Sequence, residues 1–422
     1  MSVQAPGPRG LPITGSLLKF KFGALPLLHQ AAKDYGDVVR LRFGPIRAHL
    51  LNHPDHIEHV LSRHADHYDK NTRSVARIKA TCGDSLLSAN ETAWARHRAL
   101  IQPLFRPSLF TNISEVVASE IKPLADRWEQ AAQMNTAIDV AADMMHLVIG
   151  ISARLMFSSS IDATKIEDAL AVILEDTWRR LEAPVDLSLL SGKLHRPSFK
   201  KAIATVNTTV NDLIQERQRS TAQPDDMLSR LLAAHKATDD TKLSDQELRD
   251  ATVTLLLAGH ETTANALAWA FYEMAQLPDR DPLTTNPAHV FAEAVRMYPS
   301  IWIVERRVVV DDVIAGYRIP RGTSVLISPY LIHRHPNFWE SPNTFDPDRH
   351  ATRNDRPRHA YIPFGLGQNR CIGLHMAQAI AGEVLRQLYG QFHLAPAQKV
   401  NGIDPKITLR PDGPLLLRPK VR

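Results

Sequence analysis

Apolar residues recur at three- and four-residue spacing over most of this chain, the pattern of helices that pack on one side. Four such segments lie near residues 111–131, 138–157, 164–183 and 197–220. Strict alternation of apolar and polar residues is confined to short stretches. Two of these, 38–43 and 48–52, flank the turn signal Gly44-Pro45 and predict a β-hairpin. The pattern therefore predicts a mainly α-helical protein with small β-sheets, an α+β fold.

The longest helical pattern begins at Ser244, which forms a predicted capping box with Glu247 and leads into residues 251–277. Its middle reads Ala258-Gly259-His260-Glu261-Thr262-Thr263. Glycine lowers helix stability by about 1 kcal/mol relative to alanine, and a threonine hydroxyl can bond back to a carbonyl and distort the helix. These residues leave two interpretations open, a functional distortion or a polar patch on a surface face.

A glycine-rich stretch directly before the last helical segment holds a single cysteine. It reads Phe364-Gly365-Leu-Gly-Gln-Asn369-Arg370-Cys371-Ile-Gly373. Backbone N–H groups and the dipole at a helix start favour a thiolate over a thiol. Cys371 is therefore a candidate metal ligand or nucleophile, and a buried structural cysteine in a turn is the alternative.

Two polar pairs stand at helical spacing. Trp94 and Arg98 lie four residues apart on one predicted face, and both side chains only donate hydrogen bonds, which suits a buried carboxylate. A partly buried aromatic beside a surface arginine is the alternative. Glu293 and Arg296 lie three residues apart, and as an isolated pair they contribute only a few tenths of a kcal/mol.

Composition narrows the class of protein. The chain has 422 residues and a net charge of +5, without a basic run of the nucleic-acid-binding type. Its two cysteines cannot form a disulfide framework, which fits a reducing compartment. Residues 1–20 are a proline-rich entry segment, in which residues 5–12 are expected to lack regular structure, and no membrane span is expected. Residues 53 to 67 contain five histidines at no recognisable metal-site spacing, so we interpret them as a solvated helix face. We expect one cytoplasmic domain over residues 1–422.

Four motifs in this order resemble those of the cytochrome P450 family: Trp94-x-x-x-Arg98, Ala258-Gly-x-Glu-Thr-Thr263, Glu293-x-x-Arg296 and the Cys371 stretch. The resemblance covers roughly residues 5 to 420 and is to soluble bacterial-type members. It implies haem b (iron protoporphyrin IX) between the long distal helix and the helix after Cys371, with Cys371 as the iron ligand. Asn369 stands where the family usually has Arg or His, which weakens one expected contact to a haem propionate.

The same resemblance implies roles for further residues. Trp94, Arg98 and Arg306 would share the propionate charge, with at most a neutral hydrogen bond from Asn369. Other haem-contacting positions are Ala258, Gly259, Phe364, Gly365 and Gly373. Substrate-pocket positions are Ala258, Thr263, Trp302, Ile303 and Val304. Thr262 would hydrogen-bond the activated oxygen, and Glu261 would relay protons from bulk water. Glu293, Arg296 and Arg349 would form a buried structural network, followed by His350 where the family usually has Phe.

The activity implied by the resemblance is a monooxygenase that inserts one oxygen atom from O2 into an apolar compound such as a fatty acid, terpenoid, steroid or polyketide. No flavin or iron–sulfur motif is visible, so electrons from NAD(P)H should come through a ferredoxin- or flavodoxin-type donor and its reductase. We expect a monomer. The alternatives are a P450-fold peroxygenase, isomerase or dehydratase, a haem-binding sensor without turnover, and a hydrolase using Cys371, which lacks a base at a recognisable spacing.

Overall fold

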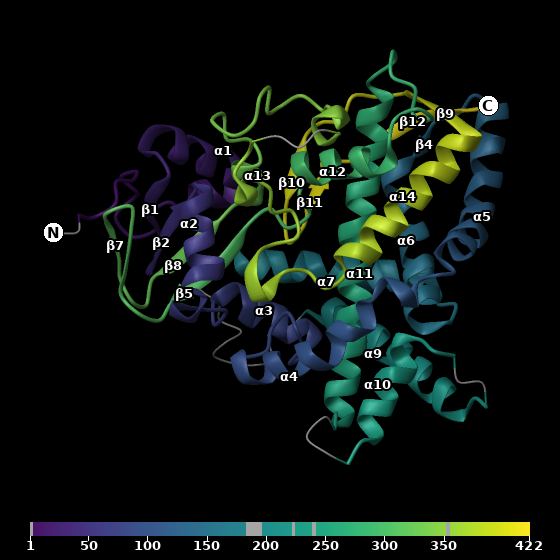
Figure 1. Cartoon of the computed structure of the whole chain (residues 1–422), viewed down its shortest axis with the longest axis horizontal. Coiled ribbons are helices and arrows are strands. Elements are labelled where there is room, and N and C mark those ends of the chain that lie inside the picture. Colours follow the sequence, from purple (N-terminus) through teal and green to yellow (C-terminus); the bar gives the residue numbers. More distant parts are fainter. Residues whose placement is uncertain (1–2, 183–195, 222–223, 239–241, 352–354) are drawn as a thin grey trace.

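The computed structural model describes residues 3–182, 196–221, 224–238, 242–351 and 355–422. Helices dominate the molecule (Figure 1). The α-helices are α1 (Leu17–Tyr35), α2 (Pro54–Glu58), α3 (Arg73–Cys82), α4 (Glu91–Ile101), α5 (Ile113–Gln133), α6 (Val140–Phe157), α7 (Ala163–Leu181), α9 (Pro197–Arg219), α10 (Met227–Lys236), α11 (Asp245–Ala275), α12 (Pro287–Met297), α13 (Pro329–Ile332) and α14 (Leu374–Gln391). The mainly α-helical fold that the sequence predicts is confirmed.

The strands form small sheets. The largest has the strand order β1 (Val38–Phe43), β2 (Ile46–Leu51), β8 (Ser324–Ile327), β5 (Val304–Val308) and β3 (Tyr68–Asp69). The others are β4 (Ile138–Asp139) with β12 (Leu416–Val421) and β9 (Phe392–Pro396), the hairpin of β6 (Asp312–Ile314) and β7 (Tyr317–Ile319), and the hairpin of β10 (Ile403–Pro405) and β11 (Leu409–Pro411). β1 and β2 pair antiparallel with Phe43 opposite Ile46, so the predicted hairpin is confirmed. β2 pairs parallel with β8.

α11 is the central helix of the fold. Its 31 residues give a length of about 46 Å, and Figure 1 shows it passing through the middle of the molecule beside α14. The side chain of Ser244 accepts from the Glu247 N–H, and the Glu247 side chain accepts from the Ser244 N–H, as the predicted capping box requires. Helices α6, α9, α12 and α14 pack against α11 and bury most of its residues.

α6 is long and apolar enough to cross a membrane. In this fold it is a core helix, because 61% of that stretch is buried and it packs along α5 and α11. Within the ranges that the structure describes, no second helix meets the same criterion.

The proline-rich entry segment ends in a helix. α1 begins at Leu17, after residues 5–12, which form no helix or named strand, as the sequence predicts. The helix kinks at Gly23, where φ is −177° and ψ is 70°, so residues 17–22 form a separate short helical piece. Ahead of it, Leu11 and Gly15 exchange two backbone hydrogen bonds around a narrow loop.

Candidate functional site

α11 is buried along nearly its whole length except on one short strip. Ala258 is exposed, and Leu257, Gly259 and Thr262 are half-buried. Ala258 and Thr262 lie four residues apart and therefore on one face of the helix. Solvent thus reaches the middle of a core helix on one face, at the segment where the sequence concentrates glycine and polar residues.

Hydroxyl groups satisfy the carbonyls of this strip. The Thr262 hydroxyl donates to the Ala258 carbonyl at 2.9 Å, and the Ser300 hydroxyl donates to the Thr262 carbonyl at 2.8 Å. The Ser152 hydroxyl donates to the Gly259 carbonyl at 3.3 Å. α11 is unbroken through these residues, so the distortion considered from the sequence is absent here. The extra donors are accommodated because helix carbonyls can accept a second hydrogen bond.

Glu261 points away from Thr262, toward the hairpin of β10 and β11. Its carboxylate accepts from the Thr408 hydroxyl at 2.6 Å and forms an ion pair with the Arg410 guanidinium. The Glu261 side chain is 6% exposed and that of Arg410 is 23% exposed. The divergence of Glu261 from Thr262 agrees with their separation of about 100° around the helix. The expectation is that Glu261 reaches toward bulk water or a surface partner; its carboxylate is buried and its partner is the partly exposed Arg410.

Cys371 lies in a tight loop two residues before the N-cap of α14. Its N–H donates to the Phe364 carbonyl at 2.9 Å. Gly365 and Gly367 adopt positive φ angles of 72° and 68°. A Cβ on Gly367 would lie 1.9 Å from the carbonyl oxygen of Leu61, so only glycine fits there. The glycines therefore shape the loop that presents the cysteine.

Cys371 is exposed as a residue. Surrounding protein atoms nevertheless raise the pKa of its thiol through burial, and the N–H groups of Gly373 and Leu374 and the charge of Arg98 oppose this only in part. The raised pKa favours the thiol, whereas the helix start alone is expected to favour a thiolate. A bound metal cation would reverse it, because a coordinated thiol is deprotonated.

Cationic side chains gather around Trp94. Arg98 lies 5.9 Å from the Trp94 ring centroid, and the Lys70 ammonium lies 5.1 Å from it. Arg98 also donates to the Arg370 carbonyl at 2.8 Å, which ties α4 to the cysteine loop. Arg306 on β5 acts electrostatically on Lys70. Residues from four separate parts of the sequence thus meet beside the cysteine loop.

The positive charges of this cluster are only partly compensated by the protein, through Glu91 at Lys70 and through Asp69 and Glu305 at Arg306. Burial, followed by the charges of Arg306 and Arg98, lowers the pKa of Lys70 to about 8. Burial also lowers the pKa of Arg306 to about 10. The hydrogen bonds of Lys70 and Arg306 go to the backbone carbonyls of Leu86 and Glu305. A bound anion stabilises buried like charges, so the cluster suits a ligand that carries carboxylates.

These parts fit a haem group. The accessible strip lies on α11, which packs against α14, and the exposed Cys371 lies in the loop that leads into α14. A thiolate can ligate iron, and the cluster of Lys70, Arg98 and Arg306 can pair with propionates. Sequence reasoning missed Lys70, because a lone lysine in an irregular segment carries no pattern. Asn369 is half-buried in the 3₁₀ turn Gly367–Asn369.

The predicted pocket residues divide into two groups. Ile303 and Val304 are half-buried and Ala258 is exposed. Trp302 is only 1% exposed, and its indole N–H donates to the Lys406 carbonyl at 2.8 Å. Thr263 is also buried. The structure therefore places Trp302 and Thr263 in the core, which differs from their expected position on the pocket wall.

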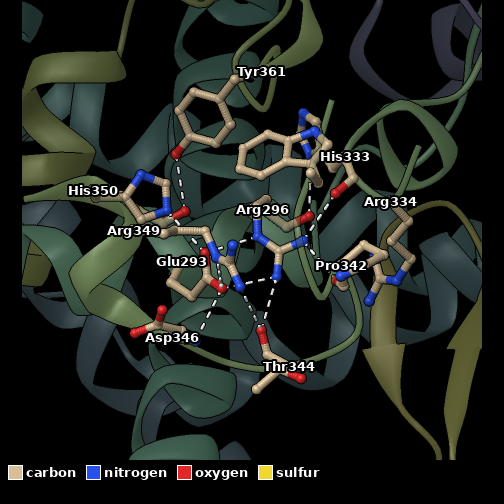
Figure 2. A network of polar contacts seen from close by, with 12 residues as sticks. Glu293, Arg296, His333, Arg334, Pro342, Thr344, Asp346, Arg349, His350 and Tyr361 are labelled. Atoms are coloured by element: carbon tan, nitrogen blue, oxygen red, sulfur yellow. Dashed lines mark hydrogen bonds and ion pairs between the residues drawn. The ribbon is translucent and has the colours of Figure 1, made fainter. Parts of the chain in front are cut away.

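Glu293, Arg296 and Arg349 form an ion-pair network in the core (Figure 2). Glu293 and Arg296 have no exposed side-chain surface and share two hydrogen bonds, of 2.7 and 2.8 Å. Arg349 donates to the same carboxylate at 2.9 Å. His350 donates to its other oxygen at 2.9 Å, a fourth member that sequence reasoning missed. Burial opposes the charge of Glu293, but bonds from His350 and Arg296 outweigh it and lower its pKa to about 2.

Histidines elsewhere make contacts within the protein. The Nδ1 atom of His333 donates to the Arg296 carbonyl at 3.0 Å, and its Nε2 atom accepts from the Ile362 N–H at 2.9 Å. Burial keeps the pKa of His333 well below its usual value, so both nitrogens are occupied in a neutral ring. His59 contacts the Asp312 carboxylate at 2.8 Å. In the part of the chain that the structure describes, no group of three or more potential metal ligands comes together.

Comparison with known proteins agrees with this geometry. The family model described as cytochrome P450 matches residues 5–281 and 288–419. The gap falls in the short connection between α11 and α12. Cyclooctatin synthase of Streptomyces melanosporofaciens is 30% identical and is matched over 98% of this chain and 95% of its own. Pentalenene oxygenase of Streptomyces avermitilis is 27% identical, over 97% and 94% of the two chains. The crystal structure of CYP175A1 from Thermus thermophillus superimposes with a TM-score of 0.79, 24% identity and coverage of 96% and 97%.

Proposed function

The chain belongs to the cytochrome P450 family, and we propose that this P450 monooxygenase inserts one oxygen atom from O2 into an apolar, terpenoid-type substrate. The observation that carries the proposal is the exposed Cys371 in its glycine loop, which leads into the helix that packs on α11 with its accessible strip. Among the relatives, one is named an oxygenase of pentalenene, a name that denotes an olefinic hydrocarbon. The apolar, partly exposed Ala258, Ile303 and Val304 suit such a compound.

Cys371 would hold the iron, and the cation cluster would hold the propionates. When bound, the haem supplies the activation of O2 for insertion into a carbon–hydrogen or carbon–carbon double bond. Arg98 connects the two functions, because it donates to a carbonyl of the cysteine loop while it lies against Trp94. Lys70 takes over charge that Asn369 cannot provide, since an amide is neutral. The protein would thereby fix the orientation of its cofactor through Cys371 and through the cation cluster.

Thr262 is the residue proposed to handle protons at the reacting centre. Its hydroxyl lies on the accessible strip and donates to the Ala258 carbonyl, so it can turn to donate elsewhere when a better acceptor is present. Glu261 can deliver protons only after its ion pair with Arg410 opens. Otherwise it anchors the β10–β11 hairpin. We propose that the Thr262 hydroxyl would donate a hydrogen bond to the reacting oxygen, while Glu261 would supply protons without contacting that oxygen.

Electrons from NAD(P)H would reach the cysteine side through a separate ferredoxin- or flavodoxin-type donor. The proposal rests on the absence of a flavin or iron–sulfur motif from the sequence. The electron-independent alternatives, a peroxygenase or isomerase, remain as outcomes of the test, as does a haem sensor without turnover.

The test has two stages. First, the reduced carbon monoxide complex of the purified protein should show the absorption band of a thiolate-ligated haem, and Cys371→His should move it to the position of imidazole-ligated haems. Second, olefinic terpenoids should be oxidised with surrogate ferredoxin, reductase and NADPH under ¹⁸O2. Product carrying one labelled oxygen supports the proposal. The proposal would be overturned if product formed only with hydrogen peroxide and not with NADPH and O2. Substrate binding without any product would also overturn it.

A further inference from the structure

The N-terminal end of the molecule presents apolar side chains to solvent in an unusual concentration. Ile13 is 85% and Phe22 is 83% exposed, Leu11 is 54% exposed and Leu18 is 38% exposed. Single exposed apolar residues are normal on protein surfaces. Four within twelve consecutive residues form a group, and grouped apolar surface marks an interaction site.

The backbone holds this group in place. Leu11 and Gly15 pair at 2.9 and 3.1 Å, so Pro12 and Ile13 form the tip of a narrow loop. The Arg42 side chain donates to the carbonyls of Leu11 and Pro12, and the Ser16 N–H donates to the Arg42 carbonyl. These hydrogen bonds therefore hold the loop against β1.

The first piece of α1 turns its apolar side outward. Leu18 and Phe22 are four residues apart and share one helical face. Water-exposed faces of helices in soluble proteins are normally polar. The kink at Gly23 separates this piece from the rest of α1, whose Ala24, Leu25 and Leu28 are buried. The outward apolar face is thus a feature of residues 17–22 alone.

The same segment is basic and contains no acidic residue. Between residues 1 and 33 the sequence has Arg9, Lys19, Lys21 and Lys33 but neither Asp nor Glu. Lys19 and Lys21 flank the apolar face and are exposed. The Lys21 ammonium lies 5.9 Å from the Phe22 ring centroid. Apolar side chains framed by lysines are the composition of segments that rest in the interface of anionic membranes.

We propose that this N-terminal patch, formed by Leu11, Ile13, Leu18, Phe22, Lys19, Lys21 and Arg9, docks the protein peripherally on an anionic lipid bilayer. The four apolar side chains would enter the boundary of the acyl chains, and the cations would meet lipid phosphates. α1 and β1 lie together toward one end of the long axis of the molecule (Figure 1). A second copy of the chain fits less well, because two identical basic patches repel each other.

The experiment is sedimentation of the full-length protein with vesicles of phosphatidylcholine alone or mixed with phosphatidylglycerol. Binding should require phosphatidylglycerol and weaken as salt rises. Lys19→Gln with Lys21→Gln should weaken it about 25-fold, at roughly fivefold for each lysine. Phe22→Ser should weaken it more than about tenfold. These side chains are exposed, so a circular dichroism spectrum should verify that the variants remain folded.

Matched controls change the same chemistry elsewhere. Lys236→Gln with Lys420→Gln removes two exposed charges, and Leu283→Ser removes an apolar side chain that is 54% exposed. Both controls should bind vesicles like the parent protein. The proposal would be overturned if the parent protein did not sediment with vesicles at low salt, or if the controls lost as much vesicle binding as the patch variants. It would also be overturned if light scattering gave a doubled mass that Phe22→Ser abolishes. The last outcome would identify the patch as a contact between copies.

Discussion

Charged residues around Trp94 show how single side chains decide what this protein can bind. Lys70, Arg98 and Arg306 come from separate parts of the chain. Burial depresses the pKa values of Lys70 and Arg306, and at Lys70 the charges of Arg306 and Arg98 add to this effect. A ligand with carboxylates would relieve this repulsion. We therefore expect these residues to affect cofactor retention more directly than catalytic rate.

Arg98→Ala should release haem faster than Asn369→Ala does. Arg98 carries a full charge and also bonds the carbonyl of Arg370, whereas Asn369 is neutral. Loss of a hydrogen bond to a charged group costs about 1.5–3 kcal/mol, so haem transfer to an acceptor globin should accelerate by about tenfold or more. Equal or reversed ranking of the two variants would contradict this division of roles.

Lys70 should make haem retention dependent on pH. Its pKa is about 8 in the protein alone, and a bound carboxylate would raise it. The stabilisation from Lys70 is therefore complete below pH 8 and is lost as the pH rises through the higher pKa of the complex. In Lys70→Met, the part of the pH dependence of the haem-loss rate that comes from Lys70 should be absent between about pH 7 and 10. Lys122→Met, an exposed control on α5, should keep the parental profile.

Thr262→Ala should separate reductant consumption from product formation. The variant keeps the apolar strip, so substrate binding should persist, but the hydroxyl on that strip is gone. We expect hydrogen peroxide in place of most of the product at a similar rate of NADPH oxidation. Thr262→Ser, which retains the hydroxyl, should restore the yield. An unchanged ratio of product to NADPH in Thr262→Ala would remove the residue from the mechanism.

At the scale of elements, the ion pair of Glu261 and Arg410 joins the central helix to the β10–β11 hairpin. The Leu409 N–H adds a bond to the Ser300 carbonyl at 2.9 Å, so the hairpin is attached beside the accessible strip of α11. These contacts hold the hairpin against α11.

A double-mutant cycle tests that attachment. Arg410→Met leaves Glu261 buried without its cation, which should cost toward the lower end of about 3–5 kcal/mol, since Arg410 is partly exposed. Combining it with Glu261→Gln should recover part of the loss, because no unpaired charge remains. Denaturant unfolding gives all four free energies. Strict additivity would show that the two side chains do not interact in solution.

At the scale of the whole molecule, the network around Glu293 binds together distant parts of the chain. Arg296 on α12 donates to the carbonyls of His333, Pro342 and Thr344, and so holds the segment that follows α13 (Figure 2). His350 extends the network where a phenylalanine would only have packed. Loss of His350 should lower the free energy of unfolding of the whole protein.

Acid should weaken the fold through Glu293. Its pKa of about 2 in the folded chain lies below the ordinary value of 4.5, so its contribution is complete above pH 4.5 and is lost as the pH falls toward 2. The shift corresponds to about 3 kcal/mol. Unfolding free energies of Glu293→Gln should be lower at neutral pH and should fall less steeply over this range. Glu129→Gln, an exposed control, should follow the parent.

The sequence alone determined what depends on neighbours within a turn or a hairpin. Helical spacing located the segments of α5, α6, α7 and α9, and the alternation around Gly44-Pro45 located the first hairpin. The capping box at Ser244 and the loop around Cys371 were also local, because each is built from residues a few positions apart. The order of the four motifs then implied the fold and the family.

Only the tertiary structure decided the contacts between distant residues. Arg410 meets Glu261 across 149 positions and His350 meets Glu293 across 57, and Lys70 lies over the Trp94 ring within electrostatic reach of Arg306. Spacing cannot reveal such pairs, because they depend on how elements pack. The pKa of Cys371 was also beyond the sequence: the helix start favours its thiolate locally, but burial by surrounding elements outweighs that preference.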